Sequence, residues 1–479
     1  MVPQRIERKQ EDRSMKPVFE RLLASIPDYK AFLTARELDE SSFALAKEYP
    51  DIVSVFPFGE TKEGRTLNCM KISGGAHVGL MFGCPHPNEP IGTMMLEHLT
   101  RSLAEDDELR RELDYTWYIV KAWDYDGLML NEKWLKGPYT LYNYSRNFFR
   151  PAGHKQVDWT FPIDYKELHF HDSISETKAM MKLIGEIRPE FIYSLHNAGF
   201  GGVYWYETAA TPEIWDEMRQ APKEMGIPMN LGEPEAPYCQ LLSPAIYKEL
   251  SITDEYDYME KYGMKDIGQA IRVGSCSADY ARKLCRSFTL LTEEPYFFDR
   301  RIDDLSPVAK TRREVALQSL DWNAEANRYL KEALGSTVGY MDPNNPFRLA
   351  LEAFTANRSE EATRRMINES PDYARPATVA EEFDNLLMDK FYKLLSYGML
   401  IRANEWELDR MDAAGEADAE KRNALTQAAK AAEEEHGKLA EYLEREIAYQ
   451  VVPIRKLVYI QLKCGLLMAE YLKSHPQTE

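Results

Sequence analysis

The stretch GCPHPNEPIGT, residues 83–93, places His86 and Glu89 three positions apart, directly after an apolar run. Imidazole and carboxylate groups are ligands of zinc, and catalytic zinc takes three protein ligands while a fourth position stays open. Residues three apart on a helical turn face the same way, so this pair could hold one ion. The pair alone is a weak signal, because Glu89 could simply serve the first turn of a following helix. A metal site therefore needs a third ligand from elsewhere in the chain.

His196 is the best candidate for that third ligand. It ends the apolar segment FIYSL, residues 191–195, and opens the glycine-bearing loop NAGFGG. A histidine at the end of a strand and beside small residues is placed to reach into a cleft. The rival pair is His169 and His171, because an H-x-H spacing can also bind metal. No strand end accompanies that pair. We therefore expect His169 and His171 to lie at the surface or to contact the metal ligands from outside.

The elements that must position these residues alternate between strand and helix up to about residue 300. Apolar, aromatic and β-branched runs predict short buried strands at 77–82, 115–123, 190–196 and 287–294. Helical stretches lie between them at 91–106 and 173–189, the second with Ser173 and Glu176 in a capping-box pattern. Such alternation predicts an α/β fold with a mixed sheet flanked by helices, and ligand sites in the loops at the carboxyl ends of its strands.

The composition changes from about Leu305 onward, where helix formers dominate. Segment 412–447 is rich in Ala, Glu and Lys, whereas 456–472 is more apolar and is expected to pack inward. We therefore expect an N-terminal extension at 1–30, a catalytic domain at 31–304 and a helical domain at 305–479. We favour a solvated cap or an oligomerisation element over a second active site for the helical domain, which makes a homo-oligomer through this domain possible.

The charge balance limits the partners. The 59 basic and 78 acidic residues give a net charge of −19, which argues against nucleic acid or an anionic membrane as the main partner. No apolar run is long enough to span a membrane. The first 14 residues lack the apolar core of a signal peptide. The six cysteines are scattered without a C-x-x-C spacing, which favours reduced thiols and a cytoplasmic protein.

Several pieces of the chain, in order, resemble the carboxypeptidase A-like zinc metallopeptidases. Within residues 34–73, Gly59, Thr61, Gly64, Arg65 and Leu67 are similar to the family's G-x-[ST]-x-x-G-R-x-L hairpin, and the later pieces are His86/Glu89, Asp126-Gly127, Arg146-Asn147-Phe148 and the strand-end His196. The resemblance covers roughly residues 30–300. It implies a carboxypeptidase-like fold and one Zn²⁺ per chain, held by His86, Glu89 and His196. It also implies hydrolysis of a peptide or amide bond next to a free carboxylate.

The family also uses a glutamate on a late strand as a general base, and TLLTEEPYF offers Glu293 and Glu294. The segment GSCSADY, residues 274–280, resembles the family's GxS-x-D, and the 14 positions from Asp279 to Glu293 match the family's spacing. Neighbouring strand residues point to opposite faces, so only one of the two glutamates can look into the site. We choose Glu293, and Glu294 stays open because a Thr-x-Glu register would select it.

The resemblance also suggests how a substrate could be held. Arg146 matches the arginine that clamps a peptide's terminal carboxylate, a task that suits a bidentate guanidinium. No arginine lies between Arg111 and Arg146, so Lys136 or Arg150 would have to stabilise the oxyanion, although either could equally be a solvated loop charge. Ala278 occupies the specificity position of the GxS-x-D segment, and its small neutral side chain argues for a bulky apolar or aromatic group.

Two rival functions remain at this stage. The PNEPIGT segment also resembles the GNExxG of aspartoacylase-type amidohydrolases, which act on N-acyl amino acids with a similar H-x-x-E and histidine set. The early hairpin and the Arg146-Asn147-Phe148 segment favour the peptidase. A non-catalytic binding protein on the same fold is the second rival. The expected substrate is thus a small peptide or an N-acyl amino acid.

Overall fold

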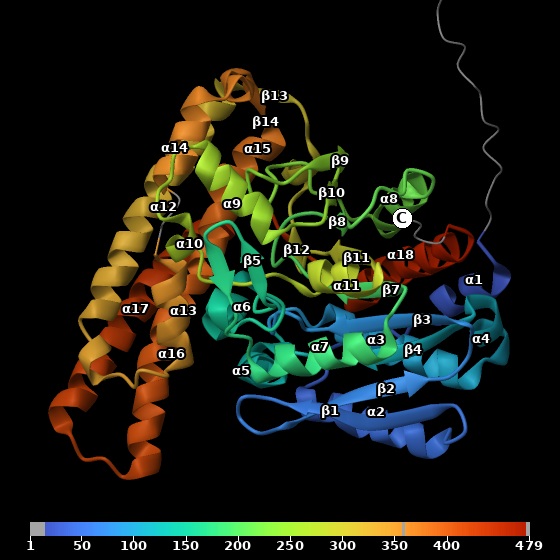
Figure 1. Cartoon of the computed structure of the whole chain (residues 1–479). Coiled ribbons are helices and arrows are strands. Elements are labelled where there is room, and N and C mark those ends of the chain that lie inside the picture. Colours follow the sequence, from blue (N-terminus) through green and yellow to red (C-terminus); the bar gives the residue numbers. More distant parts are fainter. Residues whose placement is uncertain (1–14, 357–359, 476–479) are drawn as a thin grey trace, which may run out of the picture.

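The computed structural model describes residues 15–356 and 360–475, and its centre is a nine-stranded mixed sheet (Figure 1). In spatial order the strands are β1 (Val53–Glu60), β2 (Thr66–Ile72), β4 (Tyr115–Val120), β3 (His77–Gly83), β7 (Phe191–Leu195), β11 (Phe288–Glu293), β8 (Tyr204–Glu207), β10 (Ile246–Lys248) and β9 (Leu241–Ser243). The strands β4, β3, β7 and β11 are mutually parallel, while the other pairings are antiparallel except β8 with β10. The four strands and the mixed sheet expected from the sequence are confirmed.

The parallel strands lie at the centre because both of their faces are apolar. Every residue of β7 and β11 is buried, as expected for strands covered on both sides. Alternate residues of β3 enter different cores: Leu80 and Phe82 pack on one side of the sheet, and Met81 packs on the other. The period of two thus gives each face of the sheet its own hydrophobic layer.

Helices cover both faces of this sheet (Figure 1). One layer contains α2 (Ala35–Glu48), α3 (Ile91–Glu105), α8 (Trp215–Met225) and α18 (Ile454–Ser474), with α1 (Pro17–Ala24) and α4 (Asp107–Leu113) at its edge. The other layer contains α7 (Ser175–Ile187) and α11 (Ser277–Cys285). Shorter elements join these layers, namely α5 (Tyr125–Leu135), α6 (Leu141–Asn147), η1 (Gly153–Lys155), the hairpin β5 (Ile163–Tyr165) and β6 (Leu168–Phe170), α9 (Ile252–Lys261) and α10 (Ile267–Ala270).

The capping box expected at residues 173–176 is wrong. Helix α7 begins at Ser175 with Ile174 as its N-cap, and no side chain caps it. Glu176 instead accepts a hydrogen bond from the backbone N–H of Lys62 (2.9 Å) in the β1–β2 turn. A long-range contact has therefore taken the carboxylate that a local cap would have used.

The region after residue 305 is mainly helical. Its elements are α12 (Arg312–Gly335), α13 (Pro346–Phe354), α14 (Glu360–Glu369), α15 (Val379–Phe383), the π-helical turn η5 (Asp384–Met388), α16 (Asp389–Ala414), α17 (Ala419–Glu446) and α18, with turns η3 (Val338–Tyr340) and η4 (Pro371–Ala374). The turn η2 (Arg300–Asp303) precedes this region. Two small sheets pair β12 (Phe297–Phe298) with β15 (Gln450–Val451) and β13 (Pro307–Thr311) with β14 (Pro376–Thr378). The proposed domain boundaries and the homo-oligomer stay predictions, and the first 14 residues of the expected extension lie outside the described residues.

Helix α18 leaves the other C-terminal helices and returns to the sheet (Figure 1). It packs against α3, α8, β7 and β11, and its apolar face is buried as the composition of 456–472 predicts. Helix α16 packs against α6 and forms an antiparallel pair with α17. The C-terminal region therefore shares the hydrophobic core of the sheet instead of standing apart from it. Among the described helices, none combines the length and the apolar run that crossing a membrane requires.

The contact between α16 and α6 makes a stability prediction. A Cβ on Gly398 in α16 would lie 1.9 Å from the backbone oxygen of Ser145, so Gly398→Ala must push the two helices apart. We expect this change to lower the free energy of unfolding by about 1–3 kcal/mol, as overpacking usually does. Gly437→Ala in α17 is the matched control, because nothing lies within 4 Å of the new methyl group. It should raise stability by up to about 1 kcal/mol. Equal melting temperatures for both variants would contradict this packing.

Candidate metal centre

The loop after β3 holds the first two candidate ligands in a fixed shape. Cys84 adopts a left-handed conformation (φ 50°) and its carbonyl accepts a hydrogen bond from the N–H of Asp124 (2.9 Å). The N–H of Glu89 donates to the carbonyl of His86 (3.1 Å). This hydrogen bond closes a tight turn in which both side chains point the same way. Helix α3 begins only at Ile91, whose N–H donates to Asn197 Oδ1 (3.1 Å). Glu89 therefore precedes the helix and is free to serve the site.

The third candidate, His196, is held on both sides of the strand end. Its N–H donates to the carbonyl of Thr292 in β11 (3.3 Å). Its carbonyl accepts from Gln461 Nε2 of α18 (3.0 Å), and its ring Nε2 lies 2.8 Å from Ser194 Oγ. These contacts leave ring atom Nδ1 facing the other two candidates.

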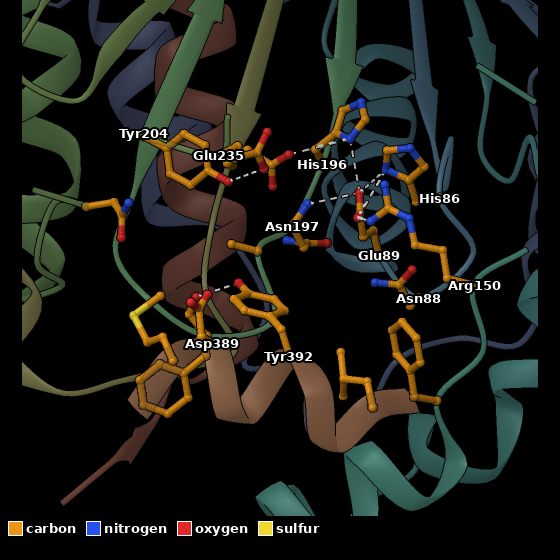
Figure 2. A pocket seen from close by; sticks show the side chains of 18 of the residues that line it. His86, Asn88, Glu89, Arg150, His196, Asn197, Tyr204, Glu235, Asp389 and Tyr392 are labelled. Carbon is orange, nitrogen blue, oxygen red and sulfur yellow. Dashed lines mark hydrogen bonds and ion pairs between the residues drawn. The ribbon is translucent and has the colours of Figure 1, made fainter. Parts of the chain in front are cut away.

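The three side chains converge in Figure 2, and one ligand atom from each lies within 4.8 Å of the others. His86 Nδ1 is 3.1 Å from Glu89 Oε1, and His196 Nδ1 is 3.0 Å from Glu89 Oε2. All three residues are at most 5% exposed. Burial, followed by the charge of Arg150, lowers the pKa of His86 to about 3, which keeps the imidazole neutral. Neutral imidazole is the form that binds metal.

These residues fit a zinc ion. His196 Nδ1 is buried and makes no hydrogen bond among the described residues, although it faces the Glu89 carboxylate. Two histidines and a glutamate are a ligand set of catalytic zinc sites, and such sites leave one position open. A divalent cation between the three groups would also compensate the buried charge of Glu89.

Glu293 and Glu294 face different surroundings. Glu293 Oε1 lies 3.6 Å from His196 Nδ1, and its Oε2 has no hydrogen-bond partner among the described residues. Burial, together with the charges of Glu89 and Glu235, raises the pKa of Glu293 well above its ordinary value. Glu294 is fully buried near Gln461 on the α18 side of the sheet. The alternation of β11 therefore turns Glu293 toward the candidate ligands and Glu294 away from them.

Arg150 lies beside the candidate ligands (Figure 2). Its Nη1 is 3.2 Å from Glu89 Oε1, and its side chain is 30% exposed. Within the described part of the chain Glu89 is the hydrogen-bond partner of this guanidinium, so its remaining donors face the three converging side chains unbonded. It can bond an anionic group of a bound molecule there.

A cavity of about 620 Å³ opens beside these residues. One wall consists of His86, Glu89, Arg150, His196 and Glu293. The opposite wall comes from the C-terminal region, and Asp389 and Tyr392 of that wall are seen facing the candidate ligands in Figure 2. Ligand-sized cavities in proteins have volumes of roughly 300–1,000 Å³, so a molecule of the size of a short peptide can enter.

The sequence profile of the zinc carboxypeptidase family matches residues 40–291, just over half of the chain. The chain belongs to the zinc carboxypeptidase family. The match includes the three converging residues and ends two residues before Glu293. This family depends on zinc, in agreement with the ligand set that the fold assembles.

Three solved structures that the chain matches are distant from it in sequence. Carboxypeptidase A of Helicoverpa armigera shares 16% identity over 58% of this chain and 71% of its own, with a TM-score of 0.32. A metallo-carboxypeptidase of Burkholderia cenocepacia shares 15% identity over 54% and 59%, with a TM-score of 0.31. A candidate metallopeptidase of Shewanella amazonensis shares 11% over 54% and 84%, with a TM-score of 0.38. No curated protein matches the chain.

Three residues that the sequence analysis proposed for the substrate lie away from the cavity. Arg146 donates to Glu405 (2.5 Å) and Glu433 (2.7 Å) of α16 and α17. Lys136 donates to the carbonyl of Phe32 (2.8 Å) and to Glu37. Ala278 is buried in α11, and none of these three belongs to the described residues that line the cavity. Their assignment to substrate binding stays a prediction.

The contribution of the C-terminal region to the cavity could not be predicted from the sequence. The lining residues beyond position 305 are Asn323, Phe354, Asp384, Met388, Asp389, Tyr392, Lys393, Leu395, Ser396 and Met399. They come mostly from η5 and α16, whose sequence has no motif that links them to a metal site. The interruption of the helical pattern at the π-turn is a local signal that only the structure reveals.

The ligand assignment predicts the zinc content of histidine variants. Purified protein should carry about one zinc per chain, as a site with three protein ligands implies. His86→Ala and His196→Ala should each lose the metal during dialysis, measured by elemental analysis, with the fold retained. The double variant His169→Ala/His171→Ala is the control, because both side chains are exposed and contact Asp164 instead. Zinc retained in the first two variants and lost in the control would move the site to that pair.

Proposed function

We propose that this member of the zinc carboxypeptidase family cleaves a peptide or amide bond next to a free carboxylate. The observation that carries the proposal is the convergence of His86, Glu89 and His196 with Glu293 at one cavity. The first three would hold zinc. The metal, when bound, supplies a Lewis acid that polarises the scissile carbonyl and makes water more acidic.

In this proposal Glu293 carries the protons. Its carboxylate borders the same cavity as the ligands, within reach of a water that attacks the carbonyl. It accepts the proton of that water and later gives it to the nitrogen that leaves. Burial and the charges of Glu89 and Glu235 raise the pKa of Glu293 above its ordinary value, which makes its carboxylate a stronger base.

Arg150 is the cation that we assign to the substrate's anionic groups. It lines the cavity beside Glu89, whereas Arg146 is held by two glutamates of the C-terminal helices. A planar guanidinium can bond a substrate carboxylate or the oxyanion that forms during cleavage. The pairing of Arg146 with Glu405 and Glu433 also weakens the resemblance that favoured the peptidase. It is therefore the observation that favours the second candidate, an aspartoacylase-type hydrolase of N-acyl amino acids.

A panel of substrates separates these two functions. N-blocked dipeptides with a free C-terminus, the same dipeptides as C-terminal amides, and N-acetyl amino acids are incubated with zinc-loaded protein, with and without a chelator. The proposed function requires chelator-sensitive cleavage of the free-carboxylate dipeptides and slower cleavage of the amides. Faster cleavage of the N-acetyl amino acids would favour the second candidate.

The two glutamates at the end of β11 give a prediction on turnover. Glu293→Gln keeps the shape of the side chain and removes the proton acceptor, so kcat should fall by roughly 10²–10⁴. Zinc content should stay normal in this variant. Glu294→Gln should change kcat by only a few fold, because Glu294 faces α18 and not the cavity. The reverse result would identify Glu294 as the base, and wild-type turnover in both variants would remove this mechanism.

The two arginines give a second prediction. Arg150→Met should lower kcat/KM by about 10- to 100-fold, the usual cost of removing a charged hydrogen bond. Arg146→Met should leave kcat/KM within a few fold of wild type and should lower the melting temperature, because Glu405 and Glu433 lose the cation that pairs with both. A larger loss of kcat/KM in Arg146→Met than in Arg150→Met would return the carboxylate clamp to Arg146.

A further inference from the structure

The cavity beside the candidate ligands is rich in carboxylates. Apart from Glu89, the acidic residues among its described lining are Asp158, Glu233, Glu235, Glu249, Glu293, Asp384 and Asp389. The basic residues of that lining are Arg150 and Lys393. The acidic groups of this lining therefore outnumber its basic groups, although Arg312 pairs with Glu233 from outside the lining. Such a cavity concentrates positively charged molecules.

Most of these carboxylates already have protein partners. Glu235 accepts hydrogen bonds from the hydroxyls of Tyr204 (2.6 Å) and Tyr206 (2.9 Å). Asp158 accepts from the N–H and the hydroxyl of Ser277 (2.6 and 3.1 Å).

The carboxylates on the C-terminal side of the cavity are also bound. Glu233 is bonded by Arg312 and Asn385. Asp384 accepts from the N–H of Glu233 (2.7 Å), and Asp389 accepts from Ser319. These groups are fixed in place by the protein itself.

Glu249 is different. It follows β10 directly, and its N–H donates to the carbonyl of Glu207 (2.9 Å), which anchors its backbone at the sheet. Its Oε2 is buried and accepts no hydrogen bond from the described residues. Asp158 and Glu235 line the same cavity and add negative charge beside it.

Arg282 is a cation whose charge acts on Glu249, and it is already engaged elsewhere. Arg282 acts on Glu249 only as a distant charge, and its Nη2 is bonded to Asp279 (3.2 Å). Burial, with the charges of Asp158 and Asp279, raises the pKa of Glu249 well above its ordinary value. Glu249 as a residue is partly exposed, but its buried oxygen without a partner is costly, and a cation that reaches it offsets that cost.

The surroundings of Glu249 suit the stem of a long basic side chain. Leu250 and Leu291 line the cavity with Glu249, and Leu291 precedes Glu293 by two residues on the same face of β11. Lysine and arginine place their methylene groups against such apolar surfaces and their charges at a polar end. In Figure 2, Glu235 and Tyr204 lie on the side of His196 opposite to Arg150. A substrate with a carboxylate and a separate cation can therefore contact both ends.

We propose that Glu249, supported by Glu235 and Asp158, binds the guanidinium or ammonium group of the substrate, so that the enzyme selects basic residues next to the cleaved bond. This proposal rests on the proposed function for the position of that bond. It replaces the apolar selectivity inferred from Ala278, which is not among the described residues that line the cavity. Selectivity thus comes from a strand-end glutamate outside the GxS-x-D segment.

The test compares N-blocked dipeptides that end in Arg, Lys, Leu or Glu, using zinc-loaded protein. We expect kcat/KM to be about 10- to 100-fold higher for Arg and Lys than for Leu, the range of a charged hydrogen bond. Glu249→Gln should remove this preference, with the loss confined to the basic substrates. Glu235→Gln should weaken it, and serves if Glu249→Gln fails to fold. Glu441→Gln, an exposed change on α17, is the matched control and should keep the preference.

A binding measurement keeps this test independent of turnover. Calorimetry with L-arginine and with L-norleucine should show binding of arginine alone, and Glu249→Gln should weaken it by at least about tenfold. If no dipeptide is cleaved but arginine binds through Glu249, the proposed function fails and the cation site stands. If dipeptides are cleaved with a preference for Leu that Glu249→Gln leaves unchanged, the cation site fails and the proposed function stands. If arginine neither binds nor directs cleavage, the cation site is likewise overturned.

Discussion

The parallel pairing of β3, β7 and β11 is the constraint on which the site depends. In this register Gly83 lies beside Leu195, and Leu195 lies beside Thr292, so the chain leaves all three strands at the same edge of the sheet. The loop with His86 and Glu89, the strand-end His196 and Glu293 meet there because of that alignment. A shift of one residue in β11 would turn Glu293 away and bring Glu294 to the cavity.

The C-terminal region completes this arrangement from two directions. Behind the sheet, Gln461 of α18 bonds the carbonyl of His196, and the hydroxyl of Tyr193 bonds the carbonyl of Gln461 (2.7 Å). In front, η5 and α16 form the far wall of the cavity. Helix α16 also holds Arg146 through Glu405, which removes from the cavity a guanidinium that the family resemblance would place there. The added helices therefore determine which side chains border the cavity beside the candidate ligands.

Much of the central fold could be predicted from the sequence because local patterns and tertiary packing agree there. The runs HVGLMF and FIYSL are apolar enough to be buried on both faces, and they became β3 and β7. The residue types and the order of His86, Glu89 and His196 in the sequence were enough to predict the candidate ligands. The partners of Arg146 and the cavity wall at Asp384 and Asp389 could not be predicted, because they depend on how distant helices pack. The position of Glu176 shows the same limit on a smaller scale, since a contact with Lys62 overrode its local cap.

X-ray absorption at the zinc edge of the metal-loaded protein tests the central claim most directly, because it reports the ligands without needing a substrate. A site formed by His86, Glu89 and His196 predicts a first shell of nitrogen and oxygen at about 2.0–2.2 Å, with outer-shell scattering from two imidazoles. His86→Ala should remove the scattering of one imidazole or the metal itself. A sulfur shell near 2.3 Å, or a spectrum without imidazole scattering, would contradict the assignment.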